Sequence, residues 1–285
     1  MNNQDFTAHT RSFRSFWLAI AVLLAVTGLF QGCAWAEFLY VYYPPELWGN
    51  LMQNNDSTCG PVAVTNSLVY LQRLYSSVYD GRLVPSKDPL FPTVPEEQAV
   101  STALATFMGT NAVGTTWDRL YLGKKDYISG GKGKKGVAPG TTSFSVVARQ
   151  DWPSQDGPKP KDVQDKTYPT AQFIYSQLRK HRDIELLVTN DTDFIAHWVT
   201  ITGIRFDTEK GTGKIYYVDP RTGGPAETNI EFHSSIGDLT TDAGYTLSAV
   251  VTEGPSAPEP CTLAMLGPAL LGIGGFLRKR LLTRA

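Results

Sequence analysis

The chain has 285 residues, enough for one domain of ordinary to large size or for two small ones. Its hydrophobic share of 42% and charged share of 19% are those of a globular protein, which argues against wholesale disorder, a collagen-like repeat and a polytopic membrane protein. The 26 basic and 27 acidic residues give a net charge of -1, so charge offers no reason to expect a nucleic-acid partner.

The first predicted element is an apolar run at residues 17–30 (WLAIAVLLAVTGLF), which follows two arginines. Small residues stand at alternate positions just after it, at Ala34 and Ala36, as signal peptidase requires. The run is shorter than the roughly 20 residues that span a membrane. We therefore expect residues 1–36 to be a signal peptide for export. A retained N-terminal anchor and a lipoprotein modified at Cys33 are the alternatives.

A helix is predicted to begin at Cys59. Ser57 or Thr58 suits its N-cap, Pro61 suits its first turn, and apolar residues follow at helical spacing at positions 64, 68, 71 and 75. The positive end of a helix dipole stabilises a thiolate, so Cys59 is a candidate nucleophile. A buried, inert cysteine is the structural alternative. We expect the small Gly60 to leave room for a substrate.

The rest of the middle of the chain is interpreted as scaffold. Helices are predicted from Pro95 to a stop at Gly109, over 116–122 and over 169–180. Strands are predicted at 184–189, 195–203, 214–219, 229–232 and 245–252. Helices followed by an antiparallel sheet predict an α+β domain over residues 37–254, with Cys59 on the helical side and a histidine on the sheet.

A thiolate needs a base, and the chain has four histidines. His9 lies in the predicted signal peptide. His181 follows the helix predicted at 169–180, where we expect a solvated cation that complements the helix dipole. His197 lies in an alternating strand pattern (IAHWVTITG) and is the preferred base. His233 is the fallback.

Two further residues complete the predicted site. If the strands around His197 and after residue 213 form a hairpin centred near Thr208, Asp219 lies opposite His197, where its carboxylate would orient the imidazole. Gln53 lies in a polar loop six residues before Cys59. With the Cys59 backbone N–H, its amide could donate hydrogen bonds to an oxyanion, although an amide in such a loop is usually just solvated.

The C-terminus has three parts in a specific order: Pro258-Glu259-Pro260, an apolar run at 261–277, and the basic residues 278–280. This ending resembles the PEP-CTERM sorting signal of Gram-negative bacteria. The resemblance implies that residues 255–285 insert transiently in the inner membrane, are recognised by an exosortase-type enzyme and are then removed. It also implies delivery to the cell surface or extracellular matrix. A plain tail anchor is the alternative.

Processing at both ends would change the cysteine inventory. Of the three cysteines, Cys33 lies in the predicted signal peptide and Cys261 in the predicted tail, so the mature protein would keep only Cys59. A lone thiol excludes an internal disulfide scaffold and a cysteine-based metal site. It leaves a buried thiol, an intermolecular bridge or a reactive nucleophile.

Together, Gln53-x5-Cys59-Gly60-Pro61, the strand motif His197-Trp198-Val199 and Asp219-Pro220 resemble the C39 peptidase-like family. The resemblance implies a papain-like fold and an exported cysteine peptidase, or a related thiol acyl hydrolase, with a peptide or protein substrate. Acyl transfer would use the same triad, and residue spacing does not separate it from proteolysis. It assigns Cys59 as nucleophile, His197 as base and acid, Asp219 as orienting group and Gln53 as oxyanion donor. No cofactor or metal is implied. The family's leader-peptide substrates are not implied, because the chain shows no transporter domain. A catalytically silent binding or matrix protein is the alternative.

Overall fold

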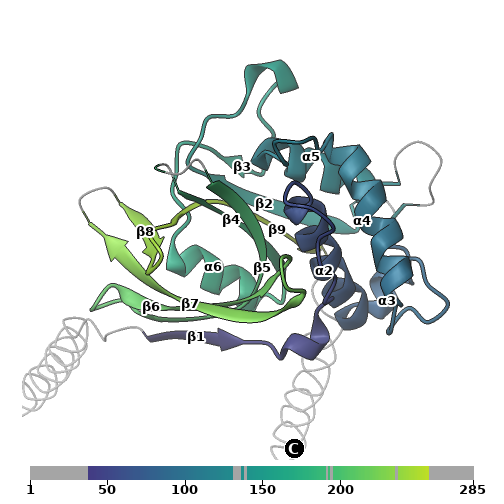
Figure 1. The fold of residues 1–285 in the computed structure, drawn as a ribbon, viewed down its shortest axis with the longest axis horizontal. Coiled ribbons are helices and arrows are strands. Elements are labelled where there is room, and N and C mark those ends of the chain that lie inside the picture. Colours follow the sequence, from purple (N-terminus) through teal and green to yellow (C-terminus); the bar gives the residue numbers. More distant parts are fainter. Residues whose placement is uncertain are drawn as a thin grey trace, which may run out of the picture.

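The computed structural model describes residues 38–130, 136–137, 140–190, 192, 195–234 and 237–256. The predicted signal peptide, most of the predicted sorting tail, His9, Cys33 and Cys261 lie outside these residues. In the described part, the chain is an α+β fold in which a layer of helices packs on one large, curled sheet (Figure 1).

The helical layer follows the first strand in the chain. Its helices are α2 (Cys59–Leu74), α3 (Ser76–Tyr79), α4 (Val94–Met108) and α5 (Trp117–Ile128). The fifth helix, α6 (Ala171–Arg179), lies in the curve of the sheet (Figure 1). Short 3-10 turns, η1 (Pro45–Leu47) and η2 (Ser154–Asp156), lie in the connections.

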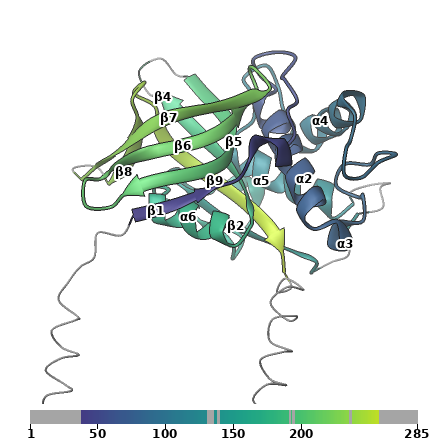
Figure 2. The same cartoon turned by 90° about the horizontal axis from the view of Figure 1, so that it is seen from below.

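The described residues form a nine-stranded sheet. Its strands are β1 (Phe38–Tyr42), β2 (Thr142–Ala148), β3 (Val163–Gln164), β4 (Asp183–Asn190), β5 (Ile195–Asp207), β6 (Thr212–Asp219), β7 (Gly224–His233), β8 (Asp238–Thr241) and β9 (Thr246–Pro255). β5 to β9 pair in sequence, and β4 pairs with both β5 and β9, so these six strands close into a ring (Figure 2). Every pair is antiparallel except β2 with β3.

The sheet has a hydrophobic cluster on each face, which explains why β5 is buried on both. Successive side chains of a strand point to opposite faces. Trp198 belongs to the cluster that joins the sheet to α2, α4 and α5. Its neighbour Val199 and the next alternate residue, Ile201, belong to the cluster inside the ring, with Ile174 and Leu178 of α6. The strand that carries His197 is therefore held between two cores.

The predicted helices are confirmed, and their ends follow from local chemistry. α4 begins with a capping box in which Thr93 and Glu96 satisfy each other's backbone N–H groups, and it ends at Gly109, whose φ is 60°. α6 begins at Thr170, whose side chain accepts a hydrogen bond from the Phe173 N–H. α5 extends beyond the helix predicted at 116–122 and ends at Ile128.

The predicted order of helices first and antiparallel sheet afterwards needs a correction. β1 precedes the helices and pairs with β5, and β2 follows α5 and pairs with β9. β1, β2, β3 and β8 were all missed in the sequence. β1 and β2 pair with strands far along the chain, and a short local pattern does not reveal such pairing. β3 and β8 have only two and four residues, too few to show a strand pattern.

Candidate functional site

Cys59 is the first residue of α2 and is 4% exposed. Thr58 occupies the N-cap position as predicted, but its hydroxyl donates to the Asn55 carbonyl and does not cap the helix. The first N–H groups of any helix lack intrahelical partners. The thiol therefore lies beside backbone donors that can serve an anion, in the position the sequence predicts for a nucleophile.

Gly60 is small for a different reason than expected. A Cβ atom added there would lie 3.0 Å from Cβ of Thr115 and 3.3 Å from Cδ1 of Trp198. The Trp198 indole in turn donates to the Thr115 carbonyl over 2.8 Å. The space beside Gly60 is thus filled by protein, and the expectation that it admits a substrate is wrong. Gly60 instead lets the start of α2 pack closely against β5 and the loop before α5.

His197 connects Cys59 to Asp219. Its Nε2 lies 2.8 Å from Oδ1 of Asp219, and the Cys59 side chain lies close enough to the ring to raise its pKa. Because Asp219 engages Nε2, Nδ1 is the nitrogen left for the thiol. The side chains of His197 and Asp219 are 8% and 20% exposed, so water screens this contact weakly. The structure brings together the three residues predicted to form the triad.

The predicted strand register is wrong by two positions, although the contact forms. β5 and β6 pair with Thr200 opposite Val218, a register that would place Arg221 across from His197. Asp219 is then the diagonal neighbour on the same face, within reach of a long side chain. The turn is centred between Glu209 and Lys210 and not near Thr208, and an irregularity between Ile201 and Gly203 offsets part of this shift before the strand reaches His197.

The two charges of this contact shift each other's titration. Burial alone would lower the pKa of His197, but its hydrogen bond to Asp219 and the nearby Cys59 side chain raise the pKa above the ordinary 6.5. Burial would raise the pKa of Asp219, yet hydrogen bonds from His197 and the Arg221 backbone N–H lower it below 3.8. The arrangement therefore favours an imidazolium beside a carboxylate.

Gln53 lies in the loop that leads to α2. Its backbone N–H donates to the Pro220 carbonyl over 2.7 Å, which ties this loop to the residue after Asp219. Its side-chain Oε1 is buried without a hydrogen-bond partner among the described atoms. Among the described residues, no hydrogen bond joins its amide to Cys59, so its role as oxyanion donor stays a prediction.

Asn66 is a positioning residue that sequence reasoning missed. Its side chain accepts a hydrogen bond from the Leu51 N–H over 2.9 Å and donates one to the Leu51 carbonyl. The backbone carbonyl of Asn66 accepts from the Gly49 N–H. The side chain is fully buried. It fixes the loop that carries Gln53 onto the same helix that carries Cys59. The sequence did offer a signal for this role. An asparagine two turns into an apolar helix is buried only if its side chain has hydrogen-bond partners.

The other described histidines do not take the base's place. His181 was predicted to be solvated, but it is partly buried, and its Nδ1 lies 2.8 Å from the Tyr43 hydroxyl. It ends α6 in a left-handed conformation with φ of 53°. His233, the fallback base, contacts the Thr240 hydroxyl across β7 and β8.

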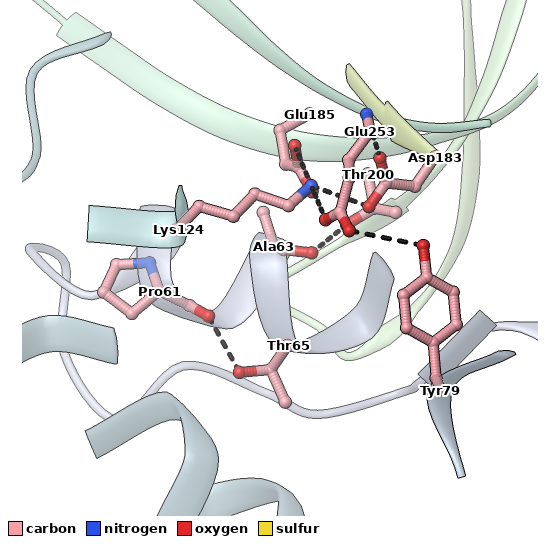
Figure 3. Close-up of polar contacts among 9 residues, drawn as sticks. All are labelled: Pro61, Ala63, Thr65, Tyr79, Lys124, Asp183, Glu185, Thr200 and Glu253. Carbon is pink, nitrogen blue, oxygen red and sulfur yellow. Dashed lines mark hydrogen bonds and ion pairs between the residues drawn. The ribbon is translucent and has the colours of Figure 1, made fainter. Parts of the chain in front are cut away.

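A second polar cluster, which the sequence analysis missed, lies between the helices and the sheet (Figure 3). Lys124 of α5 reaches Asp183 at 2.7 Å and both oxygens of Glu185 at 2.8 and 2.9 Å. Its Nζ is also 3.6 Å from Glu253, which accepts a hydrogen bond from Tyr79. All five residues are fully buried. We call these five residues the Lys124 cluster.

Burial and crowding of the carboxylates set the titration of the Lys124 cluster. Burial raises the pKa of Glu185 to about 7 and that of Glu253 to about 8, against an ordinary 4.5. The neighbouring carboxylates outweigh the effect of burial on Lys124 and raise its pKa. Because no member is exposed, the cluster cannot meet a substrate. It joins α3 and α5 to β4 and β9.

The next link between helix and sheet lies closer to the thiol. The Thr200 hydroxyl donates to the Ala63 carbonyl over 2.7 Å, and both residues are fully buried (Figure 3). This bond joins α2, which carries Cys59, to β5, which carries His197. It fixes the two elements that must present the thiol to the imidazole.

A pocket of about 140 Å³ borders the contact between His197 and Asp219, and both residues line it. A larger depression of about 460 Å³ is formed by β5 to β8 and contains neither residue. Size alone would favour the larger one, but His197 and Asp219 line the smaller, whose lining does not include Cys59.

No group of three or more His, Cys, Asp and Glu side chains among the described residues is arranged to hold a metal ion. The described helices also include none that is long and apolar enough to cross a membrane. No protein-family model matches the chain, and a search of the curated proteins finds no match.

Proposed function

We propose that this chain is a cysteine hydrolase of peptide or related amide bonds, with Cys59, His197 and Asp219 as its triad. The observation that carries the proposal is the imidazole of His197, whose Nε2 lies 2.8 Å from the Asp219 carboxylate and which has the Cys59 thiol close by. A nucleophile, a base and an orienting group in this order form the arrangement that activates a weak nucleophile.

The reaction would proceed in two steps. The Cys59 sulfur attacks the acyl carbon, and as the carbon–nitrogen bond breaks, the imidazolium of His197 gives its proton to the leaving amine. The acyl group is then held as a thioester. His197 next takes a proton from water, the oxygen of that water attacks the thioester, and the carboxylic acid and the Cys59 thiol are released.

The oxyanion formed in each step needs hydrogen-bond donors. The Cys59 backbone N–H lies at the start of α2, where the first N–H groups have no intrahelical partner. The Gln53 side chain is the second proposed donor, on a loop anchored to both α2 and the segment after Asp219. Asp219 stays ionised throughout and orients the imidazole.

The α+β architecture supports a finer assignment. A helix that starts at the nucleophile and packs against a curled sheet that carries the base is what the proposed papain-like, C39-related fold requires. The proposal extends to export and to sorting at the cell surface of a Gram-negative bacterium, on the predicted signals at 1–36 and 255–285. Signal peptidase and an exosortase-type enzyme would be the processing partners.

Hydrolysis of a randomised peptide library by the full chain tests the proposal. The wild type should release new N-termini, and His197→Gln should lose about 10²- to 10⁴-fold in rate, the usual contribution of a general base. Cys59→Ala should abolish turnover. His233→Gln is the matched control and should retain the wild-type rate. A wild type without turnover, or turnover that survives in Cys59→Ala, would contradict the proposal.

A further inference from the structure

The pocket beside His197 and Asp219 opens inside the ring of strands. Its walls are mainly apolar: Val188, Val199 and Ile215 come from three neighbouring strands, and Tyr217 and Tyr245 add aromatic surface. His197 and Asp219 form part of its lining, and Arg221 stands at its exposed side. A concave apolar site with a few polar groups at one end is typical of a ligand pocket.

We propose that this pocket binds one ring-sized apolar side chain of the substrate, that of the residue immediately after the cleaved bond. This inference rests on the proposed function, because it assumes that a bond is cleaved. Binding in the pocket can nevertheless be measured without turnover. Its volume of about 140 Å³ is close to the ~150 Å³ of an engineered apolar cavity that binds benzene. One aromatic ring or branched aliphatic side chain fits such a space.

The side of the substrate follows from the position of His197. The imidazole must give its proton to the leaving amine, so the leaving group lies against the ring. The same ring lines the pocket, whereas Cys59 does not. A side chain that reaches into the pocket past His197 therefore belongs to the leaving group and not to the acyl group on Cys59.

Charge at the pocket disfavours basic side chains. The Asp219 carboxylate is already engaged by His197 and by the Arg221 backbone N–H. Arg221 is exposed and places a cation at the pocket mouth. A lysine or arginine side chain would lose hydration there and meet a like charge, so an apolar group is preferred to a long basic one of similar volume.

Binding of small leaving-group mimics to the full chain tests the pocket directly. L-phenylalaninamide, glycinamide and lysinamide differ only in the side chain that the pocket would receive. Isothermal titration should show phenylalaninamide binding at least tenfold tighter than the other two, because even one methylene in an apolar pocket discriminates by about 10- to 200-fold.

Two variants change the pocket in opposite directions. Ala243→Leu adds bulk at the pocket wall and should remove the preference for phenylalaninamide, and Tyr245→Ala enlarges the pocket and should shift the preference towards tryptophanamide. Ala99→Leu makes the same chemical change on the exposed surface of α4 and should behave as wild type. Circular dichroism of each variant checks the fold.

The outcomes separate the two proposals. Equal binding of the three amides by the wild type, or an unchanged preference in both folded pocket variants, would overturn the pocket assignment even in an active enzyme. Retained preference with no hydrolysis of any peptide would uphold the pocket and refute the hydrolase. Where peptides are cut, the C-terminal products should begin with an apolar residue. Products that begin with glycine or lysine as often as with an apolar residue would also overturn the inference.

Discussion

Lys124→Met tests whether the Lys124 cluster holds the helical layer to the sheet. The substitution removes the Lys124 ammonium, which contacts Asp183, Glu185 and Glu253, and keeps a side chain of similar length. The three carboxylates would stay fully buried with no positive partner in the cluster. Removing one partner of a buried ion pair typically costs about 3 to 5 kcal/mol, out of a total stability of about 5 to 15 kcal/mol.

The cost should depend on pH in a defined direction. The folded state raises the pKa of Glu185 to about 7 and of Glu253 to about 8, so between the ordinary 4.5 and these values it holds protons that the unfolded chain has released. Stability from these groups is therefore complete below pH 4.5 and falls as the pH rises through 7 and 8. Loss of the cation raises the carboxyl pKa values further and steepens this fall.

Urea unfolding of the full chain at pH 5 and pH 8 measures both effects. The free energy of unfolding of Lys124→Met should fall below that of wild type at both values, and by more at pH 8. Lys125→Met is the matched control, because the neighbouring Lys125 is 46% exposed and its ion pair with Asp162 spans 3.9 Å. Exposed pairs contribute about 0 to 1 kcal/mol. A Lys124→Met cost within that range, or an equal cost at both pH values, would refute the reasoning.

Three further predictions concern the geometry around the thiol. Asp219→Asn removes the anion that raises the pKa of His197, so the imidazole pKa should fall, and NMR titration that shows it unchanged would contradict the assigned contact. Thr200→Val removes the bond from β5 to the Ala63 carbonyl, which keeps its intrahelical partner, and should lower the free energy of unfolding by about 0.5 to 1.5 kcal/mol, with a wild-type urea midpoint as the contrary result. Gly60→Ala forces a methyl group into filled space and should slow alkylation of the thiol several-fold, and an unchanged alkylation rate would show that the start of α2 can yield.

The local elements were predictable because their signals are local. Apolar spacing marks α2 and α4, Pro61 and Pro95 mark their first turns, and Gly109 marks the end of α4. The alternating pattern around His197 marks β5. The same features correctly predicted that Cys59, His197 and Asp219 meet where helix and sheet join. The error of two residues in the register did not matter, because residues two apart on a strand lie on the same face.

The Lys124 cluster was not predictable for a physical reason. Asp183 and Glu185 alternate with Ile184 and Leu186 along β4, which is the pattern of a strand with one face in water. Only the packing of α5 on that face turns it into a second buried surface. A charged residue in a strand carries no local sign of the cation, nearly 60 positions earlier, that neutralises it.

The same limit applies to the edge of the sheet. β1 places Leu39 in the core and leaves Phe38, Tyr40 and Tyr42 40 to 56% exposed. The alternation is present in the sequence, but the run is short and follows directly after the predicted signal peptide. Its partner, β5, lies more than 150 residues further on. Local pattern gave no reason to connect the two.

The pH dependence of Cys59 alkylation by iodoacetamide tests the central claim most directly. In a Cys33→Ser, Cys261→Ser background, Cys59 is the one thiol that can react. The account predicts rapid labelling well below pH ~8.5, where an ordinary thiol ionises, and an upward shift of the profile in His197→Gln but not in His233→Gln. Slow labelling that rises only near pH ~8.5 and is the same in all three proteins would contradict an imidazole-activated thiol.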